Sequence, residues 1–350
     1  MTSILIFTLL TILSALGVWI IRQYAERRRI IDHPNERSSH SAPTPRGGGL
    51  AIVIVVLLAG IFAAAWVEPS RNFNSNLIHS LIYLVCGAVI AFLGWRDDVH
   101  SLSPRVRFAV QGLVALASVL GMGYFKSVTI PLFGQLQLGI VGFIITLLWI
   151  VGLTNAYNFM DGIDGIAGGV ALSAALGWMF LATHTNHNFV FWIALAVAAG
   201  SLGFLFHNWS PAKIFMGDAG STFLGYTFAV LPLLSADEGG DALMLGTLLM
   251  WTFIMDAGVT FIRRAFKREN VFAPHRTHLY QRLVIGGYKH AQVSALYILL
   301  TLLAAALAYA WSWGQPYAPP LIILGLPLLW LFLSRYVRSL TTKDTKDTKV

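Results

Sequence analysis

Long uncharged apolar runs recur along this chain and constrain its fold more than any other feature. Eleven of them approach the roughly 20 residues that a helix needs to cross a lipid bilayer. Only 11% of the residues are charged, whereas soluble domains contain about 25%. The sequence therefore predicts an all-α, polytopic membrane protein with about eleven transmembrane helices. The runs are centred in residues 3–21, 47–66, 77–94, 106–124, 137–156, 166–183, 189–206, 220–236, 242–261, 291–311 and 317–334.

The basic residues are concentrated in alternate connections between these runs. The connections on the other side contain only Arg71 and Lys126 among the 24 Lys and Arg of the chain. Because cytoplasmic loops carry the excess of Lys and Arg, we expect the N-terminus outside and the C-terminus in the cytoplasm. The net charge of +8 then reflects topology, and a nucleic-acid partner is not expected because no soluble face gathers these charges.

Residues 1–340 are predicted to form one transmembrane domain. The first run is expected to be retained, because its N-terminal flank lacks the positive charge of a signal peptide. Residues 341–350 repeat Lys, Asp and Thr and are predicted to be a disordered tail. The active site is expected to form from the cytoplasmic loops 22–46, 95–105, 155–166, 207–221 and 262–290.

The third run ends in Asp97-Asp98. Adjacent carboxylates at the exit of a membrane helix repel one another unless a cation or a hydrogen-bond donor joins them. This pair suits a site that combines a metal ion with a phosphate, although a solvated helix end would look the same.

Two further loops combine glycine with carboxylates and amides. Residues 155–165 contain Asn155, Asn158 and two Asp-Gly pairs, at Asp161 and Asp164. Such turns direct oxygen atoms and N–H groups into a cavity, as magnesium and phosphate sites require. In the second loop, Asp218 lies between glycines at a predicted helix start, where it could hold Mg²⁺ or simply cap the helix.

The largest cytoplasmic loop is basic and contains two histidines. His275 and His278 would share one face of a helix, with Arg276 and Arg282 nearby. The cations favour an anionic substrate that carries a sugar, while a basic amphipathic helix on the lipid surface is the alternative.

Asp256 lies inside the ninth run. An intramembrane carboxylate is a functional candidate by default, and we assign it to substrate binding, with an ion pair to Arg263 as the alternative. In the first loop, Gly47 to Gly49 would open a helix and permit close backbone approach to a ligand, or form a flexible linker.

Five segments together resemble the polyprenyl-phosphate N-acetylhexosamine-1-phosphate transferase family, and the resemblance covers roughly residues 30–340. Within that family the chain looks most like the bacterial enzymes that initiate O-antigen or other surface polysaccharides. Ser101 departs from the family pattern, which usually places a charged residue there. The five segments are residues 43–48, Asp97-Asp98, 155–165, 216–221 and 275–278.

This resemblance implies an enzyme that transfers a sugar 1-phosphate from a UDP-N-acetylhexosamine to undecaprenyl phosphate and releases UMP. It implies Mg²⁺, with Mn²⁺ as a substitute, held by Asp218 and Asn158. The residues expected to be catalytic are Asp97, Asp98, Asp161, Asp164, His275 and His278. Besides Asp256, the residues expected to bind substrate are Arg46, Asn155, Asn158, Lys213, Arg276 and Arg282.

The resemblance also implies a place in the bacterial inner membrane, with the active site facing the cytoplasm and a homodimer as one option. A transporter of lipid-linked sugars is the alternative from another class, but the polar segments lie on one face and show no paired halves. A CDP-alcohol phosphotransferase is disfavoured, because the Ala-Arg pair of that family does not follow Asp161-Gly162. The identity of the sugar and the choice between single and double displacement stay open.

Overall fold

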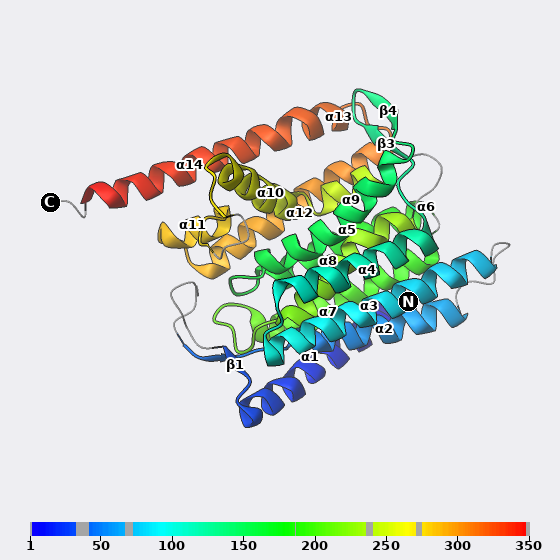
Figure 1. The fold of residues 1–350 in the computed structure, drawn as a ribbon, viewed down its shortest axis with the longest axis horizontal. Helices are drawn as coiled ribbons and strands as arrows, with labels where there is room; N and C mark the ends of the chain where they lie inside the picture. The colour runs from blue at the N-terminus through cyan, green and yellow to red at the C-terminus, as the bar shows by residue number, and fades with distance from the viewer. Residues whose placement is uncertain are drawn as a thin grey trace.

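The computed structural model describes residues 2–32, 42–66, 73–185, 187–235, 241–270 and 275–347. Over these residues the protein is an all-α bundle with two small hairpins (Figure 1). This confirms the predicted all-α, polytopic membrane fold. The first eight helices are α1 (Thr2–Arg28), α2 (Gly49–Trp66), α3 (Phe73–His100), α4 (Pro104–Met122), α5 (Val141–Met160), α6 (Ile166–Thr185), α7 (Asn188–Asn208) and α8 (Asp218–Leu234). The others are α9 (Ala242–Leu249), α10 (Trp251–Phe266), α11 (Leu279–Ile285), α12 (His290–Ser312), α13 (Ala318–Pro320), a π-helical turn (Leu321–Gly325) and α14 (Leu326–Asp347).

The hairpins pair strands antiparallel. One joins β1 (Ile31–Asp32) to β2 (Thr44–Pro45), and the other joins β3 (Ser127–Ile130) to β4 (Gly134–Gln137). In the first hairpin Ile31 lies opposite Pro45, which brings residues 31 and 45 of the predicted cytoplasmic loop 22–46 together. The intervening residues 33–41 of that loop lie outside the described part of the chain.

Each predicted apolar run coincides with helix. Within the described residues, eight helices are long and apolar enough to cross a membrane, whereas α2 and α8 are shorter. The run over 242–261, which was expected to form one span, is bent: α9 and α10 meet at an angle of 82°. The break at Met250 lacks Pro or Gly, so the local sequence did not signal it. It turns the carboxylate of Asp256 toward donors on α11 and α12. The number of crossings stays a prediction.

The centre of the bundle is formed by α6, α7 and α8. In α7 the run Ala194–Ala199 is fully or almost fully buried, because small side chains let membrane helices approach closely. At the periphery, α1 and the span Ala318–Leu340, which contains α13 and most of α14, bury only 17% and 22% of their most apolar segments. These outer helices present apolar side chains to the lipid, and the inner helices position the polar loops.

Two local expectations need correction. Residues 341–350 were predicted to be disordered, but the backbone continues as helix to Asp347, since extending a formed helix avoids the cost of nucleation. Residues 348–350 lie outside the described part. His275 and His278 do not share a helix face, because α11 begins only at Leu279 and His278 is its extended N-cap.

Candidate active site

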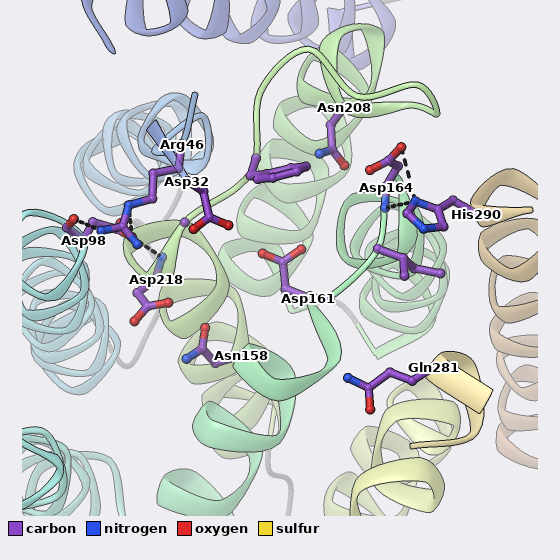
Figure 2. A pocket seen from close by; sticks show the side chains of 14 residues that line it. Asp32, Arg46, Asp98, Asn158, Asp161, Asp164, Asn208, Asp218, Gln281 and His290 are labelled. Carbon is purple, nitrogen blue, oxygen red and sulfur yellow. Dashed lines mark hydrogen bonds and ion pairs between the residues drawn. The ribbon is translucent and has the colours of Figure 1, made fainter. Parts of the chain in front are cut away.

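A cavity of about 260 Å³ opens at the end of the bundle where β1 and α11 lie (Figures 1 and 2). Its lining residues lie at or near the ends of several helices that are far apart in the sequence. It includes five carboxylates, while Arg46 and His290 are the basic residues among its described lining. The acidic lining residues are Asp32, Asp98, Asp161, Asp164 and Asp218. The remaining ones are Asn158, Gly162, Ile163, Asn208, Phe215, Gly217 and Gln281.

Asp98 joins the end of α3 to the start of α8. Its Oδ1 accepts a hydrogen bond from the backbone N–H of Asp218 (3.0 Å), and its Oδ2 accepts one from Ala219 (3.2 Å). The guanidinium of Arg46 donates to the backbone carbonyl of Asp98 and lies 3.9 Å from its carboxylate. A negative charge is favourable at a helix N-terminus, so Asp98 fixes the position from which the Asp218 side chain enters the cavity.

Glycine permits this close junction. Gly217 has φ of 78°, a left-handed conformation that side chains disfavour, and a Cβ there would lie 2.7 Å from Asp98 Oδ2. Gly94, one turn before Asp98 on α3, faces the backbone of Asp218 and Ala219 so closely that a Cβ would collide with it.

Asp97 points elsewhere, because successive residues of a helix are rotated by about 100°. Its Oδ2 lies 2.7 Å from Arg107 Nη1, and its Oδ1 accepts the N–H of Leu102 at 2.6 Å. Asp97 does not line the cavity. Arg107 also lies 3.8 Å from Asp218 Oδ2, so it links the two carboxylates. Sequence reasoning missed Arg107; its place at the start of the next predicted run, 106–124, was the available signal.

The turn between α5 and α6 carries two carboxylates in different environments. Asp161 points into the cavity (Figure 2), and burial, followed by the charges of Asp98 and Asp164, raises its pKa to about 7. Burial alone would also raise the pKa of Asp164, but hydrogen bonds from His290 and the Ala212 N–H lower it below its usual value. Because their environments move the two pKa values in opposite directions, Asp161 and Asp164 can differ in protonation state at neutral pH.

His290, the first residue of α12, was also missed from the sequence. Its Nδ1 lies 3.3 Å from Asp164 Oδ2 (Figure 2). Ser294, one turn later on α12, donates to the backbone carbonyl of Asp164 at 2.6 Å. The start of α12 therefore fixes the second half of the α5–α6 turn, an arrangement formed across 126 residues of sequence.

The two asparagines of the α5 motif have different positions. Asn158 lines the cavity, and its Oδ1 accepts a hydrogen bond from Ser221 Oγ on α8 at 2.5 Å. Asn155 lies one turn earlier and donates to Gln111 on α4 at 2.6 Å. Asn155 is not among the cavity-lining residues, and its side chain joins α5 to α4.

The comparisons with known proteins agree with this geometry. The profile described as "Glycosyl transferase family 4" matches residues 80–236, which include four of the five cavity carboxylates. A relative in Bacillus subtilis, "Probable undecaprenyl-phosphate N-acetylglucosaminyl 1-phosphate transferase", is 35% identical over 300 residues, covering 83% of this chain and 80% of that protein.

The chain belongs to glycosyl transferase family 4. Among further relatives, the Escherichia coli K12 "Undecaprenyl-phosphate alpha-N-acetylglucosaminyl 1-phosphate transferase" is 30% identical over 350 residues, covering 95% of this chain and 89% of that one. A "Decaprenyl-phosphate N-acetylglucosaminephosphotransferase" of Mycobacterium tuberculosis H37Rv is 33% identical over 299 residues, covering 78% and 73%. The resemblance seen in the sequence motifs is therefore confirmed at the level of the family.

Asp256 was predicted to bind substrate, but its carboxylate accepts hydrogen bonds from groups of the protein itself. It is 1% exposed and accepts the N–H groups of Leu279 (2.7 Å) and Tyr280 (3.1 Å) and the hydroxyl of Tyr297 (2.6 Å). Its predicted partner Arg263 instead donates to the Thr277 carbonyl. The carboxylate therefore anchors the start of α11, and it is not among the residues that line the cavity.

The two histidines of the last predicted cytoplasmic loop lie next to each other, outside the cavity lining. The rings of His275 and His278 lie 4.9 Å apart, and the His278 ring stacks on Tyr280. Burial and nearby positive charges lower the pKa of His275 to about 4. Neither histidine lines the cavity, whereas Gln281 of α11 does. The remaining residues predicted to bind substrate but absent from the lining are Lys213, Arg276 and Arg282.

The cavity contains oxygen ligands but no complete metal cage. Within the described ranges, no three His, Cys, Asp or Glu side chains come together closely enough to hold a metal ion by themselves. Mg²⁺ usually takes one or two carboxylates and completes its shell with water and substrate phosphates. Asp218, whose side chain is 32% exposed, and the amide oxygen of Asn158 fit this incomplete type of site.

Proposed function

We propose that this protein transfers N-acetylglucosamine 1-phosphate from UDP-N-acetylglucosamine to undecaprenyl phosphate, releasing UMP. The acidic cavity is the observation that carries the proposal. The cavity lining contains five carboxylates but only one arginine and one histidine among its described basic residues. The two anionic substrates would therefore be repelled unless a divalent cation accompanied them. The names of the relatives in Bacillus subtilis and Escherichia coli support the donor sugar and the acceptor lipid.

The proposed cofactor is Mg²⁺, with Mn²⁺ as a substitute, and Asp218 and Asn158 would hold it. Bound there, the ion would neutralise charge on the donor diphosphate, as metals do in phosphoryl transfer. Asp98 would maintain the position of Asp218 through its hydrogen bonds to the start of α8. Arg107 would restrain the Asp218 carboxylate from the other side.

The proposed reaction is a single displacement. An oxygen of the acceptor phosphate forms a bond to the sugar-linked phosphorus, while the bond from that phosphorus to the bridging oxygen of UMP breaks. A phosphate monoester with its second pKa near 6 is already largely dianionic at pH 7, so a strong general base is not needed. Positioning and charge neutralisation would supply most of the acceleration. Arg46 would supply positive charge in the cavity, and Asp161 and Asp164 would form part of its wall.

The proposed location is the bacterial inner membrane, with the cavity facing the cytoplasm. The basic loops lie at the same end of the bundle as the cavity, which supports this orientation. The product would enter O-antigen or another surface polysaccharide. A transporter would need paired broken helices, and the described part of the chain has one bent pair, α9 with α10.

The test is a reconstitution of the full chain in detergent with undecaprenyl phosphate, Mg²⁺ and a panel of UDP-N-acetylhexosamines. We expect UMP release with UDP-N-acetylglucosamine and a lipid-linked product of matching amount. Asp218→Asn should raise the Mg²⁺ concentration for half-maximal activity at least about tenfold, whereas the exposed Asp241→Asn should leave it unchanged. Absence of UMP with every donor would contradict the proposal. A phosphorylated enzyme trapped with one substrate would refute single displacement.

A further inference from the structure

A second cavity, of about 500 Å³, lies outside the catalytic cavity and shares none of its lining residues. It is formed where the end of α10, the following turn, α11 and α14 meet. Its walls carry five cationic side chains from these four segments. They are Arg263, Arg264, Lys267, Arg282 and Arg338.

The lining of this basic cavity contains more basic than acidic side chains. Glu269 is the acidic residue among its described lining, and it pairs with Arg264 at 3.0 Å. Two of the cations lie near the C-terminus of α10, where the helix dipole favours them. That explanation does not cover Arg282 and Arg338, which come from other helices. Burial and the charges of Arg263 and Arg338 lower the pKa of Arg282, as expected when guanidinium groups lie close together.

Two of the helices that supply the cavity wall, α10 and α14, also carry exposed apolar side chains. On α10, Ile262 is 54% and Phe266 86% exposed, and on α14 Phe332 is 66% exposed. The two helices are joined by the edge-to-face contact of Trp251 and Trp330, with ring centroids 5.7 Å apart. A free phosphate would use the cations alone, whereas an amphiphile would use both the cations and the exposed apolar side chains.

We propose that this basic cavity binds the phosphate headgroup of an anionic membrane phospholipid, with the acyl chains lying along α10 and α14. Basic pockets between membrane helices suit anionic headgroups. The site is linked to the catalytic cavity through α11, where Arg282 follows Gln281 of the catalytic lining. A bound lipid would therefore hold α11 between α10 and α14. This proposal stands apart from the transferase reaction and does not depend on it.

The test measures lipid binding to the full chain in neutral detergent by native mass spectrometry. The probes are dioleoyl phosphatidylglycerol, dioleoyl phosphatidylcholine and inorganic phosphate. The test variant is Lys267→Gln with Arg338→Gln. The matched control is Arg268→Gln with Arg335→Gln, which removes the same charge from adjacent exposed positions that do not line the cavity. Size-exclusion profiles and circular dichroism establish that both double variants are folded.

We expect phosphatidylglycerol to bind at least tenfold more tightly than phosphatidylcholine. The test variant should bind phosphatidylglycerol about 25-fold more weakly, about fivefold for each cation removed, while the control changes less than threefold. Equal weakening in both double variants would overturn the proposal, because it would reveal attraction by net charge alone. Displacement of the lipid by an equal concentration of inorganic phosphate would also overturn it, in favour of a free-phosphate site. If the double test variant does not fold, the single variants Arg338→Gln and Arg335→Gln allow the same comparison of phosphatidylglycerol binding.

Discussion

Replacing Asp256 by Asn tests whether this buried carboxylate positions the loop or contacts the substrate. In the structure it accepts hydrogen bonds from Leu279, Tyr280 and Tyr297. The Thr260 hydroxyl donates a longer one at 3.5 Å, and His278 Nδ1 lies 3.4 Å from the carboxylate. Tyr280 in turn donates to the Phe159 carbonyl at 3.2 Å, just before the turn that carries the cavity carboxylates. Asp256 is therefore connected to the cavity through α11.

The magnitude follows from the hydrogen bonds. An amide has one acceptor oxygen, so its NH2 group would face at least one of the donors. Hydrogen bonds to a charged group contribute roughly 1.5–3 kcal/mol, and an orphaned buried donor costs about 1–3 kcal/mol. We expect the docked state of α11 to lose about 2–3 kcal/mol, which shifts its equilibrium about 30- to 150-fold.

Limited proteolysis of residues 275–280 and steady-state kinetics measure the effect. We expect Asp256→Asn to be cleaved much faster and to lose kcat with little change in KM, while the exposed Asp241→Asn resembles the unmodified chain. Tyr297→Phe removes one donor but leaves the carboxylate, and should show a smaller effect in the same direction. A variant with unchanged cleavage and a raised KM for the nucleotide sugar would refute the anchoring role in favour of substrate contact.

Three further predictions concern the cavity itself. Gly94→Ala should separate α3 from α8 and abolish activity, whereas Gly112→Ala, where a Cβ meets open space, should retain it; equal activity in both would contradict the packing argument. Because the pKa of Asp161 is raised from 3.8 to about 7, its ionisation opposes folding increasingly as pH rises from about 4 to about 7, by up to about 4 kcal/mol. In the metal-free protein, Asp161→Asn should therefore gain thermal stability over the unmodified chain between pH 5 and pH 8, and a constant difference would exclude the shift. Asn158→Ala should raise the Mg²⁺ requirement, whereas Asn155→Ala should not, and the reverse order in a Mg²⁺ titration would show that the two amides were assigned wrongly.

Several features of the site could be predicted from the sequence because they are local. The lengths of the apolar runs required membrane helices, and the Asp-Gly turn at Asp161 placed oxygen atoms at a helix end. The motif at Asp218 also opens a helix as expected. These patterns depend on residues adjacent in the chain, so no tertiary information was needed to recognise them.

Tertiary structure decided which of these polar residues share one cavity. The sequence presents Asp97 and Asp98 as equivalent, but the rotation between successive helical residues turns one to Arg107 and the other to the start of α8. It could not pair Asp164 with His290, since the contact joins residues far apart in the chain. The bend between α9 and α10, which takes Asp256 to its donors, likewise depends on packing. The sequence by itself determined that the protein lies in a membrane, which segments form helices and which chemical groups are available, because these properties follow from composition and short-range spacing. Only the packing of the helices determined which groups face each other, since that depends on rotation and contact between distant segments.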